Sequence, residues 1–367
     1  MILQFGAGNF LRCFVDLFAA QLNRDPETAV GPIHVVQSTG SGRAEALNAR
    51  DCQYHVAIQG FQNGEVVDGV EFVDSIQKVW VAATEWEAIL DLARDPELKL
   101  IVSNTTEAGF KLEDGDTIEA TPPASFPAKL LACLMARHAV GESAPQVIPC
   151  ELIEQNGQRL RDLVIEQAAR WNLGSDLIEW IQNEVRWINN LVDRIVPGTP
   201  KQHALLAEDP LLLSCEPYAI WAIETEEPFA FQHPAVVTAA DISPFYLAKV
   251  RILNGLHSAL VCHALPLGIE TVRKAVEHAQ VGPWLEQLLA EEIVPVLHGR
   301  VDDPAGFGKV TLDRFRNPFL EHKLEAIALN HEDKVKVRLM PTYNEYHEKF
   351  GKAPKLLEAA LKAGGFV

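Results

Sequence analysis

Met1-Ile2-Leu3-Gln4-Phe5 is a short apolar run, and Gly6-Ala7-Gly8-Asn9 follows it directly. Apolar residues then recur at helical spacing from Phe10 to Leu22, and His34-Val35-Val36-Gln37 has the composition of a second buried strand. This order predicts a βαβ unit with a glycine turn between the first strand and the helix. Glycines allow a backbone to approach a pyrophosphate, and the first turn of a helix offers free N–H groups to an anion. The start of the chain therefore predicts a dinucleotide-binding fold.

The glycine turn departs from the full GxGxxG fingerprint at two points. Leu11 occupies the position of the third glycine, and no Asp or Glu ends the second strand to bind a ribose hydroxyl. A tight strand-to-helix turn of any doubly wound protein could have the same spacing, so that alternative stays open. Arg43, near the second strand, leaves the choice between NAD and NADP open as well. The residues predicted to bind the cofactor in this region are Gly6, Gly8, Asn9, Phe10 and Gln37.

Strands and helices continue to alternate as far as residue 171. The predicted elements are a helix opened by the capping box Thr84-x-x-Glu87 and ended by Asp95-Pro96, a strand at Leu98–Val102, a helix that begins at Ser125 with Pro127 in its first turn, a strand at Gln146–Cys150 and a helix around Gly157–Trp171. This alternation is typical of a doubly wound α/β sheet.

A polar loop of small residues, Ser103–Gly109, follows the strand at 98–102. Parallel sheets bind their ligands at the carboxyl ends of the strands. The loop therefore adds Asn104, Thr105 and Glu107 to the predicted cofactor-binding residues, although a plain connecting loop would have a similar composition.

From about residue 241 the pattern changes to helices. Asp241-Ile242-Ser243-Pro244 predicts a helix start, with Ser243 as N-cap and Pro244 as the first helical residue. We therefore predict an α/β protein with an N-terminal Rossmann-type doubly wound domain at 1–238. A mostly α-helical C-terminal domain at 239–367 is predicted to follow and to carry the substrate and the catalytic residues.

Three polar residues interrupt the apolar stripe of the helix that follows Pro244, namely Lys249, Asn254 and His257. On a regular helix of about 100° per residue, Asn254 lies about 140° and His257 about 80° from Lys249, so all three share one half of the helix. A lysine with a lowered pKa can act as general base in alcohol oxidation, an asparagine amide can donate to the developing oxyanion, and a histidine can orient the substrate. A snorkelling lysine, a polar-face asparagine and a core histidine would give the same pattern.

The composition excludes several classes of protein. Hydrophobic residues make up 48% and charged residues 22% of 367 residues, which is globular composition, and the net charge of −18 disfavours nucleic acids and anionic membranes as partners. The six cysteines form no CxxC pair, and no HExxH or short His/Cys/Asp cluster is present among the twelve histidines. The first twenty residues lack the apolar core of a signal peptide. We therefore expect a cytoplasmic protein with reduced thiols and without a bound metal.

The chain resembles the polyol-specific long-chain dehydrogenases, also called the mannitol dehydrogenase family. The matching strings are Gln4–Arg12, Ser103–Gly109, Ser125–Leu130, Asn190–Gly198, Lys249–His257 and Arg314–Phe319. The resemblance implies that Lys-x4-Asn-x2-His carries the catalytic lysine Lys249, the oxyanion-stabilising Asn254 and the substrate-orienting His257. It also implies a Rossmann-type domain, a helical domain, an active site between them, and NAD or NADP without zinc. We expect NAD on this basis.

Within the family, the chain resembles the branch of tagaturonate reductases, also called altronate oxidoreductases. The strings that carry this resemblance are Val36–Arg43, Asn104–Gly109, Cys150–Ile153 and Glu216-Pro217-Tyr218-x-x-Trp221. The chain is shorter than typical members, and Leu152 stands where some relatives have an asparagine, which Asn156 could replace. Arginine forks bind carboxylates or phosphates well. The predicted substrate-binding residues are Asn156, Asp193, Arg316 and Arg338.

These observations predict an NAD-dependent oxidoreductase that interconverts a keto-hexuronate and its polyol acid, of the tagaturonate/altronate type. A mannitol-1-phosphate 5-dehydrogenase or another polyol dehydrogenase is the first alternative. An NAD-dependent sugar-acid epimerase and a non-enzymatic dinucleotide-binding protein are alternatives of other classes. We expect a small sugar acid or polyol as the partner, and a monomer or a small homo-oligomer.

Overall fold

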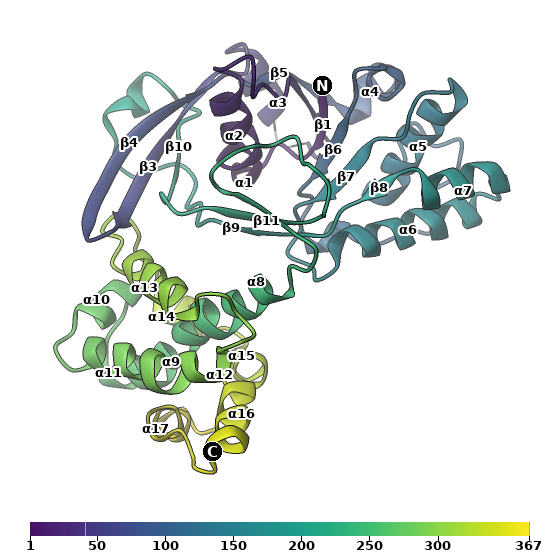
Figure 1. Cartoon of the computed structure of the whole chain (residues 1–367). Helices are drawn as coiled ribbons and strands as arrows, with labels where there is room; N and C mark the ends of the chain where they lie inside the picture. Colours follow the sequence, from purple (N-terminus) through teal and green to yellow (C-terminus); the bar gives the residue numbers. More distant parts are fainter. Residues whose placement is uncertain (41, 367) are drawn as a thin grey trace. The chain divides into compact units, whose positions relative to one another are not determined.

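The computed structural model describes residues 1–40 and 42–366, which form two compact units. Unit 1 comprises residues 1–57, 70–215 and 219–240, and unit 2 comprises residues 58–69, 216–218 and the chain from 241 onward. In Figure 1, unit 1 is mostly purple to teal and unit 2 mostly green to yellow. Two short segments from the region before residue 239 thus group with the helical unit.

A six-stranded parallel sheet forms the centre of unit 1 (Figure 1). Its strand order is β5-β2-β1-β6-β7-β8. The strands are β1 (Ile2–Phe5), β2 (Ile33–Gln37), β5 (Ile76–Val81), β6 (Leu100–Ser103), β7 (Gln146–Pro149) and β8 (Arg186–Trp187). Counted within this sheet, the order is the 3-2-1-4-5-6 of dinucleotide-binding folds, in which the ligand crevice lies where the order reverses. Here that point is the carboxyl end of the neighbouring strands β1 and β6.

Alternate residues of β1 face opposite layers of unit 1. Leu3 and Phe5 pack into a hydrophobic core with the helices on one face of the sheet. Gln4, between them, points to the other face, where its amide donates to Asp16 at 3.4 Å. The helices of unit 1 are α1 (Asn9–Arg12), α2 (Val15–Leu22), α3 (Arg43–Asn48), α4 (Ala82–Arg94), α5 (Phe126–Ala139), α6 (Asn156–Arg170) and α7 (Ser175–Asn183), with short 3₁₀ turns η1 (Glu107–Gly109) and η2 (Ala204–Ala207).

The helix predicted to run through Phe10–Leu22 is broken into α1 and α2. Phe14 leaves the helical region with φ −130° and ψ −90°. The carbonyl oxygen of Arg12 accepts a hydrogen bond from the hydroxyl of Tyr54 at 2.9 Å, and the Arg12 guanidinium lies 4.1 Å from the centre of the Tyr54 ring. A tertiary contact therefore takes a carbonyl that a continuous helix would have used.

Two predicted helix starts are shifted. The helix α4 begins at Ala82 rather than behind Thr84, and the carboxylate of Glu85 accepts from the backbone N–H of Val81, so the capping box at 84–87 was a wrong prediction. The helix α8 (Ser243–Ala248) begins one residue before Pro244. Its first N–H is bound by the Asp241 carboxylate, which therefore takes the role expected of a Ser243 hydroxyl.

Two three-stranded sheets accompany the central sheet. The first has the order β10-β3-β4, and the second β12-β11-β9. Their strands are β3 (Tyr54–Gln62), β4 (Glu65–Val73), β10 (Leu213–Cys215), β9 (Asn190–Asp193), β11 (Ile220–Glu224) and β12 (Val236–Ala239). The turn between β3 and β4 is Asn63-Gly64, with φ values of +54° and +85°. Two left-handed residues are what a two-residue hairpin loop requires.

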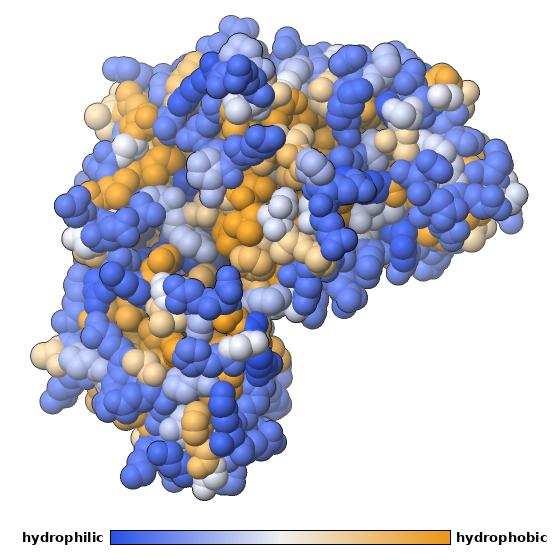
Figure 2. Space-filling view, in the orientation of Figure 1, coloured by the Kyte–Doolittle hydropathy of each residue, from blue (hydrophilic) through white to orange (hydrophobic). Residues whose placement is uncertain are grey.

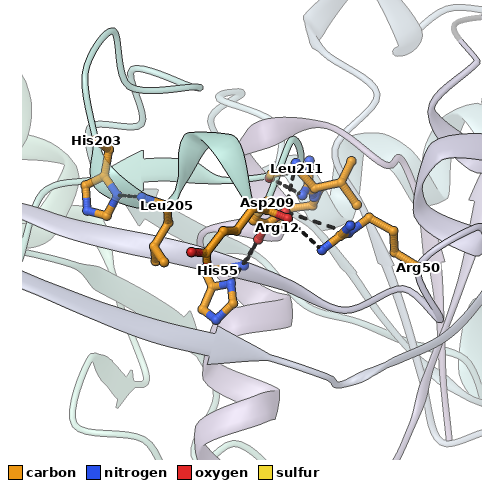
Figure 3. A network of polar contacts seen from close by, with 8 residues as sticks. Arg12, Arg50, His55, His203, Leu205, Asp209 and Leu211 are labelled. Atoms are coloured by element: carbon orange, nitrogen blue, oxygen red, sulfur yellow. Dashed lines mark hydrogen bonds and ion pairs between the residues drawn. The ribbon is translucent and has the colours of Figure 1, made fainter.

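Asp209 anchors the loop between β9 and β10 to the rest of unit 1, as Figure 3 shows. Its carboxylate is buried and accepts from the backbone N–H of His55 at 2.7 Å, from the His55 ring at 3.0 Å and from the backbone N–H of Leu211 at 2.9 Å. The side chain of Arg12 donates to the carbonyl oxygen of Leu211 at 2.8 Å. The loop is thereby held against α1, the helix that follows the glycine turn in the sequence.

Unit 2 is a helical bundle around one hydrophobic core. Buried Arg251 ties two of its helices together, because it donates to Thr342 and forms an ion pair with Glu345 at 2.7 Å. The helical segments are α8, η3 (Lys249–Leu253), α9 (Asn254–Ala264), η4 (Leu265–Leu267), α10 (Val272–Glu277), α11 (Val281–Leu288), η5 (Leu289–Ile293), α12 (Val294–Leu297), α13 (Pro304–Phe315), α14 (Leu324–Ile327), α15 (His331–Arg338), α16 (Met340–Phe350) and α17 (Lys355–Ala363).

Hydrophilic residues cover most of the face drawn in Figure 2. Across residues 1–40 and 42–366, the helices are too short or too polar for any of them to span a bilayer.

Candidate functional site

The glycine turn after β1 leaves its backbone accessible. Gly6 has φ +121°, and a Cβ at this position would lie 2.9 Å from the carbonyl oxygen of Asn104, so the turn requires glycine. A Cβ at Gly8 would meet nothing within 4 Å, which leaves space beside the turn. The predicted neighbours Asn9 and Phe10 are half-buried. Because α1 has only four residues, its helix dipole contributes little to binding a pyrophosphate. The accessible backbone of the glycine turn is the feature that suits this group.

At the end of β2, the polar side chain of Gln37 forms hydrogen bonds to main-chain groups. The amide of buried Gln37 donates to the carbonyl oxygen of Thr39 at 2.7 Å and accepts from the N–H of Ala44 at 2.8 Å. Both ends of this amide are thus bound to main-chain groups, at Thr39 and at Ala44. Arg43 donates to the carbonyl oxygen of Ala7 at 3.1 Å, so a guanidinium lies next to the glycine turn.

The loop after β6 forms a wall of an open pocket in unit 1. The pocket is lined by Asn104, Thr106, Glu107, Ala108, Glu151 and Leu152. The side chain of Asn104 donates to the carbonyl oxygen of Cys150 at 2.7 Å, and that of Thr105 donates to the Glu151 carboxylate at 3.0 Å. The glycine turn and this loop also touch each other through Gly6 and Asn104. The structure therefore brings the predicted cofactor-binding residues together at the carboxyl ends of β1, β2 and β6.

Asn156 and Asp193 are both buried in unit 1. The amide nitrogen of Asn156 donates to the carbonyl oxygens of Pro149, Glu151 and Asn190, and its oxygen accepts from the backbone N–H of Gly157 and Asn190. Because main-chain groups occupy this amide and the side chain is 1% exposed, Asn156 holds β7 and β9 together. The structure thus gives it a role other than the predicted one toward substrate.

A π-helical segment separates two of the predicted catalytic residues in unit 2. The segment η3 begins at Lys249, and the N–H of Asn254 donates to the carbonyl oxygen of Lys249, five residues back. An i→i+5 bond places these two residues in successive turns on one face of the helix. The angle between them around the helix axis is therefore smaller than the 140° of a regular helix. The prediction from a regular helix was therefore wrong in geometry, although both side chains do lie in one half of the helix and are half-buried.

His257 is buried one turn further along α9. Burial lowers the pKa of His257 well below its usual value, and His322, Arg314 and Arg338 add to this effect. The ring makes a hydrogen bond to the backbone of Leu253, whereas Nε2 has no partner among the described residues. The imidazole is therefore neutral at physiological pH, with a proton on Nδ1 and a lone pair on Nε2. A buried acceptor of this kind calls for a donor from a ligand or a water.

The two arginines predicted to bind an anion differ in their surroundings. Arg316 forms ion pairs with Glu286 at 2.8 Å and with Asp313 at 3.5 Å, so acidic side chains already neutralise it. Arg338 is half-buried, donates to the Ser258 hydroxyl at 3.4 Å and contributes positive charge at His257. Only Arg338 thus combines partial burial with proximity to a predicted catalytic residue.

No group of three His, Cys, Asp or Glu side chains among residues 1–40 and 42–366 could hold a metal ion. All six cysteines are buried, and none of them forms a disulfide bond.

Two family models cover nearly the whole chain. The model of the mannitol dehydrogenase Rossmann domain matches residues 1–235, and that of the mannitol dehydrogenase C-terminal domain matches residues 241–364. The chain belongs to the mannitol dehydrogenase family. The family prediction and the predicted fold class are thereby confirmed, because the Rossmann-type sheet and the helical bundle fall in the two matched regions.

Relatives of known function in this family include two altronate oxidoreductases. The chain is 39% identical to the altronate oxidoreductase of Bacillus subtilis over 378 residues, which covers 99% of this chain and 78% of the relative. It is 38% identical to the altronate oxidoreductase of Halalkalibacterium halodurans, with 99% and 74% covered. These matches confirm a dehydrogenase that acts on a CH–OH group.

Two solved structures share the fold. A D-sorbitol dehydrogenase in substrate-free form has a TM-score of 0.87 at 23% identity, and covers 99% of this chain and 79% of that one. The mannitol 2-dehydrogenase of Pseudomonas fluorescens, solved as a ternary complex with NAD and D-mannitol, has a TM-score of 0.77 at 22% identity, with 99% and 78% covered.

Two buried charged groups of this family member were not among the predicted site residues. Glu151 binds Thr105 of the β6 loop, and its signals in the sequence were its place after a strand and its inclusion in the string Cys150–Ile153. Arg314 forms a bidentate ion pair with Glu216 at 2.7 Å, and its guanidinium lies 4.2 Å from the centre of the Tyr218 ring. Both partners come from the segment 216–218, far from Arg314 in sequence, so local patterns could not reveal the pair.

Proposed function

We propose that the chain interconverts a keto-hexuronate and its polyol acid, with NAD(H) as the redox partner. The observation that carries the reaction is the π-turn that places Lys249 and Asn254 on one helix face. One turn further on lies His257, whose Nε2 has no partner among the described residues. The hexuronate is favoured by the altronate oxidoreductases, which match 99% of this chain at 33–39% identity.

In this proposal Lys249 is the general acid for carbonyl reduction and the general base for the reverse reaction. Its ammonium group donates a proton to the oxygen that becomes the hydroxyl, while the Asn254 amide donates a hydrogen bond to the same developing oxyanion. The i→i+5 turn supports a shared target, because it brings both side chains to one face of the helix.

His257 orients the substrate as a hydrogen-bond acceptor. With Nδ1–H bound to the Leu253 backbone, Nε2 can accept from a substrate hydroxyl. Burial lowers the pKa of His257, and the nearby His322, Arg314 and Arg338 add to this effect, so the imidazole stays neutral and keeps this acceptor at physiological pH. Because burial already lowers the pKa of His257, proton transfer is assigned to Lys249 and not to this residue.

Arg338 is proposed to bind the substrate carboxylate. A planar guanidinium can make two parallel hydrogen bonds to a carboxylate, and the contact that Arg338 makes to Ser258 is long, at 3.4 Å. Arg316 is less suited, because Glu286 and Asp313 already pair with it. This assignment favours a sugar acid over an uncharged polyol.

The cofactor site is proposed to be the carboxyl end of β1, β2 and β6. The residues present fit a dinucleotide, because the required Gly6 and the open Gly8 form an accessible cradle for a pyrophosphate. Asn9, Phe10, Asn104, Thr105 and Glu107 would line the remainder. When bound, NADH supplies the hydride. We favour NADH because the Arg43 guanidinium is engaged with Ala7, although its position also makes it the group that would accept the extra phosphate of NADP.

The test is turnover of NADH with a panel of tagaturonate, fructuronate, fructose 6-phosphate and fructose. Oxidation of NADH with one hexuronate is the expected result. Turnover with the sugar phosphate alone would replace the proposal by a mannitol-1-phosphate dehydrogenase. Conversion of a sugar acid without net NADH consumption would indicate an epimerase, and NADH binding without any turnover would indicate a non-enzymatic role.

A further inference from the structure

Glu151 is a buried carboxylate that has no cationic partner among residues 1–40 and 42–366. It follows β7, is 2% exposed, and accepts hydrogen bonds from neutral donors on Ser103 and Thr105. Its Oε1 accepts from the backbone N–H of Thr105 at 2.7 Å and from the Thr105 hydroxyl at 3.0 Å, and its Oε2 accepts from Ser103 at 3.0 Å. Burial of a carboxylate is costly unless its hydrogen bonds compensate, so this arrangement calls for a reason.

The segment that Glu151 holds has an unfavourable backbone conformation. Thr106 has φ +70° and ψ 164°, although a β-branched residue rarely adopts a positive φ. Such conformations persist only where the surroundings enforce them, and they concentrate at ligand sites. The Thr105 side chain also packs closely against Gly109, because a Cβ at Gly109 would overlap the Thr105 hydroxyl. Thr105 is therefore held between Glu151 and Gly109, and the next residue, Thr106, has the strained conformation.

The held segment shapes the region proposed for the cofactor. Thr106 and Glu151 both line the pocket at the carboxyl end of β6. The carbonyl oxygen of Asn104, one residue before Thr105, contacts the glycine turn at the place where only Gly6 fits. The backbone N–H of Asn104 in turn donates to the carbonyl oxygen of Phe5 at 3.0 Å. A shift of Thr105 would therefore reach the glycine turn through a single residue.

We infer that Glu151 is a positioning residue for the dinucleotide, because its carboxylate locks Thr105 and Thr106 into the conformation that forms the cofactor-binding wall at β6. This inference rests on the proposed function. The carboxylate acts through Thr105 and does not itself contact the cofactor. A positioning role differs from simple fold stabilisation in one measurable way. Loss of the contact between Glu151 and Thr105 should lower dinucleotide affinity more than it lowers global stability.

Three variants separate these roles. Glu151→Met keeps the length of the side chain and removes all acceptors. Glu151→Gln can keep all three contacts, since its oxygen can accept from Thr105 while its NH₂ donates to Ser103, whose hydroxyl can rotate. Thr105→Val keeps the shape of Thr105 and removes only the hydroxyl. Glu154→Met is the matched control, because Glu154 is exposed on the same loop.

The measurement is the Kd of NADH by fluorescence titration, with the midpoint of thermal unfolding recorded for every variant. We expect Glu151→Met to raise the Kd about tenfold or more, Thr105→Val to raise it less, and Glu151→Gln to restore most of the affinity. Thr105→Val should add little in the Glu151→Met background, because the shared contact is already lost. Glu154→Met should leave the Kd unchanged.

The outcomes distinguish this inference from the proposed function. An unchanged NADH Kd in a folded Glu151→Met variant would overturn the positioning role and leave the proposed function intact. If Glu151→Met unfolds, an unchanged Kd in both Thr105→Val and Glu151→Gln, together with lowered unfolding midpoints, would assign Glu151 to stability alone and overturn the inference. A wild-type chain that binds neither NADH nor NADPH would overturn both proposals.

Discussion

Asp16 offers a prediction in which stability changes with pH in an unusual direction. The side chain lies on α2 and is 0% exposed. One carboxylate oxygen accepts from Gln4 at 3.4 Å, and the other has no partner among the described residues. Burial raises the pKa of Asp16 to about 8, against the opposing effects of Gln4 and Arg12. The folded protein thus holds a proton that the unfolded chain releases at about pH 4.

The sign and the size follow from proton linkage. Between the ordinary pKa of 3.8 and about 8, the folded state binds more protons than the unfolded state, so the free energy of unfolding falls as the pH rises. The loss is about 1.4 kcal/mol for each pH unit well inside that window, and roughly 2 kcal/mol between about pH 6 and pH 8, where titration of the folded state flattens the slope. The Asp16→Asn variant cannot titrate and should not show this loss.

The assay is urea unfolding, followed by tryptophan fluorescence at several pH values, for the wild-type chain and Asp16→Asn. All other titrating groups are common to both, so the difference between the two unfolding free energies isolates Asp16. We expect the unfolding free energy of Asp16→Asn, relative to that of the wild type, to rise by roughly 2 kcal/mol from about pH 6 to pH 8. Parallel stability curves over this range would refute the reasoning.

Three further predictions concern the proposed reaction. Arg338→Gln should raise the KM for a hexuronate about tenfold or more, whereas Arg316→Gln should change it little, as steady-state kinetics can show; equal effects would contradict the carboxylate assignment. Arg43→Ala should weaken binding of NADPH more than that of NADH in fluorescence titrations, and an equal loss for both would show that Arg43 has no part in cofactor choice. His257→Gln, which retains a neutral acceptor, should keep more activity than His257→Leu, and equal activities would remove the role of Nε2.

The local order of the first half of the chain could be predicted from the sequence. The strand at 2–5, the glycine turn and the helix that begins behind Ser125 follow from apolar periodicity and turn chemistry, which act over a few residues. The predicted strand at Gln146–Cys150 agrees with β7 to within one residue. The hairpin β3–β4 had a signal too, in Asn63-Gly64, that the predictions overlooked.

Long-range contacts account for what the sequence could not show. The helix at 10–22 breaks because Tyr54 binds the carbonyl oxygen of Arg12, and no local pattern reveals a partner 42 residues away. Asn156 was predicted to face substrate, yet distant backbone groups occupy its amide.

The helix that carries Lys249 and Asn254 shows the same limit within a few residues. Residue spacing placed Lys249 and Asn254 in one half of a helix, but a π-turn has no recognised signature in a single sequence. The types of residue could thus be predicted, whereas their geometry depended on the folded structure.

The central claim is that Lys249 carries proton transfer in the reduction of a keto-hexuronate. Its most direct test is the rate of NADH oxidation with tagaturonate for the wild-type chain, for Lys249→Ala and for the exposed control Lys352→Ala, with NADH affinity measured in parallel. The account predicts turnover by the wild type and the control, and a fall in kcat of about 10²–10⁴-fold in Lys249→Ala with unchanged NADH affinity. Wild-type kcat in Lys249→Ala would contradict it.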